Sequence, residues 1–118
     1  SLLYKRVEST IQFYLEAKRV IKDKVMHLKS EGMKDVSIYG INHISEVLYI
    51  VLKELGIEVN SVVDEKREGE EWFGYKVIGM DQFVKSNSSV LIIASFDKEK
   101  IDSFCKEQKN VKVVALRD

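Results

Sequence analysis

The segment from Val36 to Asp64 constrains the fold more than any other part of the sequence. A β-branched run over residues 36–41 leads through a tight turn into apolar residues at helical spacing, which end at Gly56. A second β-branched run, residues 57–64, follows directly. Strand, helix and strand in this order predict a βαβ unit, whose strands are parallel and whose crossover is right-handed.

The rest of the chain continues the alternation of strands and helices. An aromatic turn over residues 72–79 leads into a short strand, and residues 89–95 (SVLIIAS) are typical of a central strand buried on both faces. Asp97 can cap a helix, and residues 111–116 predict the last strand. Residues 34–118 are therefore expected to form an α/β domain with a Rossmann-like, doubly wound, mostly parallel sheet of about five strands.

Residues 1–33 show a different pattern, that of one long helix. Neither Pro nor Gly interrupts residues 2–31, and apolar side chains recur at alternating steps of three and four, broken only by Lys18. This seam consists of Tyr4, Val7, Ile11, Tyr14, Ile21, Val25 and Leu28. Such a helix is roughly 45 Å long, more than one small core covers. We expect it to pair with a second copy in a homodimer; the alternative is an amphipathic helix lying on its own domain. Since Ser1 lies inside the helical pattern, we also expect a longer parent protein.

Composition and charge exclude several classes of protein. The chain has 118 residues, of which 45% are hydrophobic and 32% charged, as in a folded domain and unlike a disordered segment. Its 19 basic and 19 acidic residues cancel, so they supply no general attraction to nucleic acid or to an anionic membrane. The charge is uneven, however: residues 1–35 hold eight Lys/Arg and five Asp/Glu, or +3, whereas residues 36–118 hold eleven and fourteen, or −3.

The scarce cysteine and histidine residues limit the chemistry further. One cysteine and two histidines cannot form a disulfide or a structural zinc site, which fits a reducing, cytoplasmic location without a bound metal. Cys105 shares a helical face with Ile101 and is expected to be buried. No nucleophile lies near a base in the sequence, so we expect no catalytic residue and no enzyme. No apolar run reaches the roughly 18 to 20 residues that span a bilayer, so no membrane contact is expected.

A ligand site, if the fold holds one, has a predictable position. In doubly wound sheets, ligands bind beyond the carboxyl ends of the strands where the winding direction reverses. That reversal should fall between the first strand and the strand at residues 89–95, so the loops at residues 40–45 and 95–97 border the site. The candidate cofactor-binding residues are Gly40, Asn42, His43, Ser45, Asp64 and Ser95.

The first of these loops departs from the dinucleotide fingerprint G-x-G-x-x-G. Gly40 is present, but Asn42 and Ser45 replace the second and third glycines, and a side chain at position 42 obstructs a pyrophosphate. Asp64 is placed to accept ribose hydroxyls. His43 starts the helix, where it can donate to a phosphate or carboxylate or simply be solvated. Two interpretations stay open: a nucleotide-like ligand, and a Rossmann-like scaffold with a purely structural role.

The order of these motifs resembles a known group of domains. The sequences Ile38-Tyr39-Gly40, Val62-Val63-Asp64, Phe73-Gly74-Tyr75-Lys76-Val77 and Ile92-Ile93-Ala94-Ser95 follow one another in the chain. They resemble the Rossmann-like nucleotide-binding domains of nucleotide-sugar and polysaccharide-biosynthesis proteins, which show glycine-rich, Asp-ending and Phe-x-Gly-hydrophobic-Pro-Val elements in this order. The resemblance covers residues 36–118, with Asn42 replacing a glycine and Lys76 a proline. It implies NAD or a nucleotide sugar as the ligand.

The N-terminal helix carries a second resemblance. Leu3-Tyr4-Lys5-Arg6-Val7-Glu8, leading through Tyr14-Leu15-Glu16-Ala17, looks like the linker helix of bacterial or archaeal winged-helix transcriptional regulators. This resemblance implies a non-catalytic regulatory and dimerisation domain that senses a nucleotide, a nucleotide sugar or a related small anionic ligand at the strand carboxyl ends, with DNA bound only through a domain upstream. The alternatives are the cofactor-binding portion of a nucleotide-sugar-modifying oxidoreductase or acyltransferase, and a purely structural interaction module.

Overall fold

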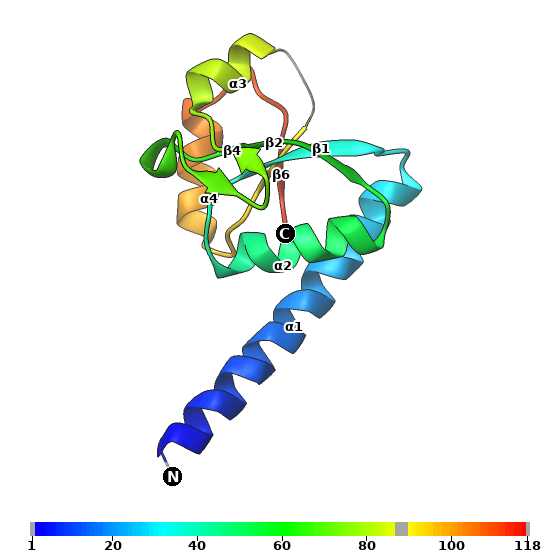
Figure 1. Ribbon diagram of the computed structural model, residues 1–118. Coiled ribbons are helices and arrows are strands. Elements are labelled where there is room, and N and C mark those ends of the chain that lie inside the picture. The colour runs from blue at the N-terminus through cyan, green and yellow to red at the C-terminus, as the bar shows by residue number, and fades with distance from the viewer. Residues whose placement is uncertain (1, 87–89, 118) are drawn as a thin grey trace.

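The structure, a computed structural model, describes residues 2–86 and 90–117. It is an α/β domain with a long N-terminal helix (Figure 1). The elements in chain order are α1 (Leu2–Ser30), β1 (Asp35–Tyr39), α2 (His43–Glu54), β2 (Glu58–Val63), the 3-10 turn η1 (Glu65–Arg67), β3 (Glu71–Trp72), β4 (Tyr75–Lys76), α3 (Met80–Ser86), β5 (Leu91–Ile93), α4 (Lys98–Glu107) and β6 (Val113–Ala115).

The main sheet confirms the predicted Rossmann-like fold class. Its strands are all parallel and lie in the order β2-β1-β5-β6. The chain winds from β1 outward to β2, then returns to the other side of β1 for β5 and β6, so the winding direction reverses between β1 and β5. This is the predicted place. Ser89, which we assigned to the central strand, lies outside the described residues.

The predicted number of about five strands is wrong, because the main sheet has four strands within the described residues. The segment after β4 contributes only one isolated parallel bridge to the sheet, between Val63 and Ile78. Its neighbour Val77 donates its backbone N–H to Glu70 on the separate β3–β4 hairpin, and α3 begins at Met80. Only one residue is therefore left to pair with β2, too few for a strand.

Apolar side chains cover both faces of the sheet. One cluster joins α1 and α2 to the sheet and includes Ile21, Leu48 and Ile38, all of which are fully buried. A second cluster joins α3 to the opposite face through Phe83 and Leu91, with Phe104 of α4 packed against it. Helices on both faces explain why the central strand β5 is apolar at every position.

The long helix divides into two halves with different environments. The inner half, residues 17–30, packs on the body through Ala17, Ile21, Val25 and Leu28, all buried. Lys18 Nζ also lies 3.0 Å from Glu54 Oε1 of α2. The outer half, residues 2–16, projects away from the body in Figure 1, and its largest apolar side chains are exposed. Among the described residues, no helix is both long and apolar enough to cross a bilayer.

Candidate functional site

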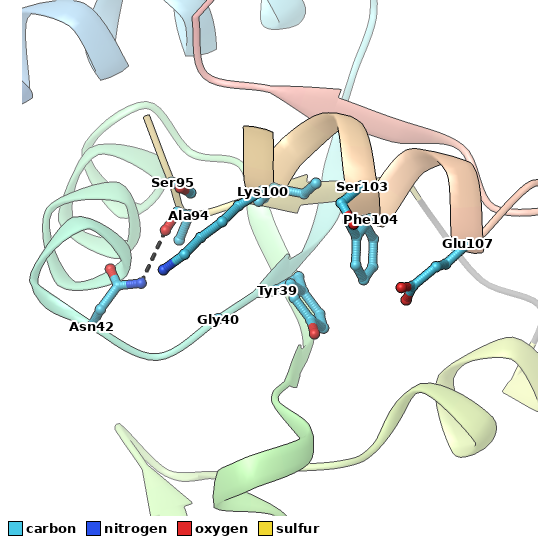
Figure 2. Close-up of a pocket in the computed structure, with 10 residues that line it drawn as sticks. Tyr39, Gly40, Asn42, Ala94, Ser95, Lys100, Ser103, Phe104 and Glu107 are labelled. Atoms are coloured by element: carbon cyan, nitrogen blue, oxygen red, sulfur yellow. Dashed lines mark hydrogen bonds between the residues drawn. The ribbon is translucent and has the colours of Figure 1, made fainter. Parts of the chain in front are cut away.

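A crevice of about 360 Å³ opens at the carboxyl ends of β1 and β5, where the winding reverses. We call it the switch-point crevice. Three segments border it: the end of β1 with the following turn, the end of β5, and one face of α4 (Figure 2). Its lining residues are Tyr39, Gly40, Asn42, Ile93, Ala94, Ser95, Lys100, Ser103, Phe104 and Glu107.

The turn between β1 and α2 is held by the chain's own side chains. The backbone N–H of Ile41 donates to Asp64 Oδ2 at 2.9 Å, and that of Asn42 donates to Ser45 Oγ at 2.8 Å. The N–H groups of Ile44 and Ser45 donate to Asn42 Oδ1 at 2.8 and 3.0 Å. These are helix-start amides of the kind that bind a phosphate in dinucleotide-binding folds. Here they already have internal acceptors.

Asn42 also ties this turn to the neighbouring strand. Its Nδ2 donates to the backbone carbonyl of Ala94 at 2.9 Å, across the gap between β1 and β5 (Figure 2). Gly40, next to this contact, has φ +99°, a backbone conformation that favours glycine. The residue that replaces the second fingerprint glycine thus joins two segments that line the crevice by a hydrogen bond.

The second helix start beside the crevice is capped in the same way. Asp97 Oδ1 accepts from the backbone N–H of Glu99 at 3.0 Å and of Lys100 at 3.4 Å. Ser95 Oγ accepts from the N–H of Asp97 at 3.0 Å. The second and third amides of both α2 and α4 are therefore already hydrogen-bonded beside the crevice.

The predicted site residues divide into two groups. Gly40, Asn42 and Ser95 line the crevice. The other three do not. Ser45 is buried and forms a capping box with Asn42. Both carboxylate oxygens of Asp64 accept hydrogen bonds from backbone amides, those of Ile41 and Lys66. His43 is solvated, with 92% of its side chain exposed and Nδ1 3.7 Å from Glu46 Oε2. The binding of a cofactor by these six residues remains a prediction.

One face of α4 completes the crevice, and none of its residues is among the predicted site residues. Lys100, Ser103, Phe104 and Glu107 follow a spacing of three and four residues, which places them on one side of a helix. That spacing is the signal that was available. The expectation that Cys105 is buried is wrong, because its side chain is exposed. In that part of α4, Ile101 is buried and Phe104 packs against the core.

Aromatic and charged groups give the crevice its electrostatic character. The rings of Tyr39 and Phe104 lie together with centroids 4.2 Å apart. Burial raises the pKa of Tyr39, and the nearby carboxylates of Asp64, Glu65 and Glu107 raise it further. Lys100 supplies positive charge at the other side. Within residues 2–86 and 90–117, no three His, Cys, Asp or Glu side chains are arranged to hold a metal ion.

Fold and crevice together define a Rossmann-like domain that carries a long, half-projecting N-terminal helix. Protein-family models, curated protein sequences and solved structures give no significant match to this chain. Its function is therefore argued from its own residues.

Proposed function

We propose that this chain is a non-catalytic dimerisation and regulatory domain of a transcriptional regulator. The outer half of α1 pairs with its equivalent in a second copy, and the Rossmann-like body holds a small ligand in the switch-point crevice. One observation carries the pairing: Leu3, Val7 and Ile11 are 72%, 51% and 55% exposed on a helix that projects from the body.

Continuity of the apolar seam supports pairing. Ile21, Val25 and Leu28 at its inner end are buried against the body, while Val7 and Ile11 of the same seam are exposed. An isolated helix of about 15 residues is marginal in water unless an apolar face is covered. The outer half would gain that cover from a second copy.

The regulatory part of the proposal is supported by the resemblance of residues 3–8 and 14–17 to linker helices of winged-helix regulators. A paired helix would hold two DNA-binding heads at a fixed separation, as two half-sites about one helical turn apart require. A ligand would change this geometry only by binding one arrangement of the dimer more tightly than another.

A reporter assay tests the dimerisation role directly. The chain is fused behind a winged-helix head that represses its operator only as a dimer. We expect the fusion to repress, and Val7→Glu with Ile11→Glu to abolish repression, because two carboxylates would be buried at the pairing seam. Ser9→Glu with Gln12→Glu adds the same charge to the opposite helix face and is the matched control.

Sedimentation of the unfused chain gives a second reading of the same question. A dimer that Val7→Glu and Ile11→Glu dissociate, and that Ser9→Glu and Gln12→Glu leave intact, is expected. A chain that sediments as a monomer at every concentration, together with a fusion that fails to repress, would refute the dimerisation role.

The alternative is the cofactor-binding portion of a nucleotide-sugar-modifying oxidoreductase or acyltransferase. It requires NAD, a nucleotide sugar or an acyl-CoA to bind, and the capped amides of Ile41, Asn42 and Ser45 count against a bound pyrophosphate. A ligand at 100 times its dissociation constant stabilises a protein by about 2.7 kcal/mol. Thermal unfolding with each of these compounds tests that requirement, and no shift with any of them would count against the enzyme.

A further inference from the structure

Polar groups in the switch-point crevice fall into two classes. Those on the β1 and β5 side, Asn42 and Ser95, are engaged with the backbone. Those on α4 are not: within the described part of the chain, the side chains of Lys100, Ser103 and Glu107 have no hydrogen-bond or ion-pair partner. Groups that are free to bind a ligand thus lie on one helix face.

Opposite charges lie at the two ends of this face. Lys100 and Glu107 are seven residues apart, which separates their Cα atoms by about 10 Å along the helix. Figure 2 shows the Lys100 side chain stretched toward Asn42 and Ala94, and the Glu107 carboxylate at the other end, near Tyr39. The Tyr39 and Phe104 rings lie between them and are half-buried. The crevice therefore offers a cation, an aromatic surface and an anion in a row.

These features oppose a dinucleotide. A pyrophosphate carries at least two negative charges, and the crevice offers it one ammonium, Lys100. The second and third amides of α2 and of α4 are already capped. Glu107 at the other end would repel it. A volume of about 360 Å³ also lies at the lower end of the range for ligand pockets, about 300 to 1,000 Å³. A small ligand with one anionic group fits better.

We propose that the switch-point crevice binds a compact aromatic zwitterion. Its ring packs on Tyr39 and Phe104, its carboxylate pairs with Lys100, and its ammonium group pairs with Glu107. This inference rests on the ligand-sensing half of the proposed function and names the chemical class of its small ligand. It does not depend on pairing through α1.

Three matched probes test the proposal: 4-(aminomethyl)benzoate, which has both charges, 4-methylbenzoate and 4-methylbenzylamine. Binding to the whole chain is followed by the backbone amide shifts of Gly40, Ser95 and Phe104 in nuclear magnetic resonance spectra. For a probe of this size we expect a dissociation constant of about a millimolar. Each single-charge probe should bind about fivefold more weakly, because it lacks one exposed ion pair.

Variants of α4 then assign each charge. Lys100→Met should reduce zwitterion binding to that of 4-methylbenzylamine, and Glu107→Gln to that of 4-methylbenzoate. Lys98→Met and Glu99→Gln change the same charges on the same helix outside the crevice and should leave binding unchanged. Amide shifts of the sheet report in the same spectra that each variant is folded.

Three results would overturn the proposal. The first is an equal dissociation constant for all three probes, and the second is no shift of the crevice amides at the solubility limit of the zwitterionic probe. The third is that NAD or UDP-glucose shifts the same amides and binds more tightly than the zwitterion. The sedimentation experiment is independent of these binding measurements, because it reports only on pairing through α1. A wrong ligand class is therefore distinguishable from a wrong dimerisation role.

Discussion

Asn42 holds three parts of the chain together at the crevice. Its Oδ1 caps the first turn of α2, and its Nδ2 donates to Ala94 beyond β5. Asn42→Ala removes the cap and leaves the Ala94 carbonyl without this donor. We expect the free energy of unfolding to fall by about 1 to 2 kcal/mol. Urea unfolding followed by circular dichroism measures the change.

The neighbouring His43 provides the control for Asn42. Its side chain is almost fully solvated, and its Nδ1 lies 3.7 Å from Glu46 Oε2. His43→Ala should therefore change stability by less than about 0.5 kcal/mol. Equal urea midpoints for the two variants would mean that the capping box does not hold the turn.

Tyr39 makes stability depend on pH in the alkaline range. Burial raises its pKa above the ordinary value of 10.0, and the carboxylates of Asp64, Glu65 and Glu107 add to this. The folded chain thus holds the phenolic proton more tightly than the unfolded chain does. The resulting stabilisation is complete below about pH 10 and is lost as the pH rises through the folded-state pKa.

The expected result is a fall in the free energy of unfolding above about pH 10, with a shallower fall in Tyr39→Phe. The variant keeps part of the dependence, because burial also raises the pKa of Tyr75. Urea unfolding at a series of alkaline pH values provides the comparison. Identical slopes for the two chains would show that the Tyr39 proton is held no more tightly in the folded state.

At the scale of elements, the two halves of α1 should respond differently to the same substitution. Ile21 is fully buried against the body, whereas Ile11 is 55% exposed. Ile21→Ala leaves a cavity and should cost about 2 to 5 kcal/mol. Ile11→Ala should cost less than about 0.5 kcal/mol in the monomer. Urea unfolding at protein concentrations well below the dimer dissociation constant gives both values.

A large loss for Ile11→Ala under those conditions would indicate that the outer half of α1 packs on its own body. That outcome would favour the ordinary amphipathic helix over the paired one. The control is Gln12→Ala, which removes an exposed side chain about 100° around the helix from Ile11 and should be neutral.

Elements with strong local signals could be predicted from the sequence. Asn42 and Gly56 mark the two ends of α2, and they do so in the structure, where Asn42 is the N-cap and Gly56 has φ +73°. The absence of a fifth strand could not be predicted in this way. Whether residues 76–79 pair with the sheet depends on competition from the β3–β4 hairpin, and the hairpin takes Val77. That competition is tertiary and leaves no local pattern.

The site shows the same limit. Its location follows from strand order, which the alternation of elements made predictable. The use of each side chain does not, because it depends on contacts between distant residues: Asp64 with the amide of Ile41, and Asn42 with the carbonyl of Ala94. A carboxylate at a strand end looks the same in sequence whether it binds a ribose or a backbone amide. Here the Asp64 carboxylate accepts a hydrogen bond from the backbone amide of Ile41.

At the scale of the molecule, shape and charge separate the two proposed roles. The described chain measures 51 × 33 × 30 Å, and the outer half of α1 projects at one end (Figure 1). The crevice lies in the body, lined by residues of β1, β5 and α4. Net charge within residues 2–16 is zero, since Lys5 and Arg6 balance Glu8 and Glu16. Pairing of the outer half of α1 must then come from burial of apolar side chains. Recognition of a charged ligand belongs to the crevice.

This division predicts how the dimer responds to salt. The Debye length falls from about 10 Å at 0.1 M salt to about 3 Å at 1 M, which weakens exposed ion pairs but not apolar contacts. The dimer dissociation constant from sedimentation equilibrium should therefore change by less than about threefold between these salt concentrations. Replacing chloride by sulfate should tighten the dimer, because sulfate strengthens apolar burial. A dimer that dissociates in 1 M salt would instead be held by charge. Because residues 1–35 carry a net charge of +3 and residues 36–118 a net charge of −3, that result would indicate contact between the helix of one copy and the body of the other.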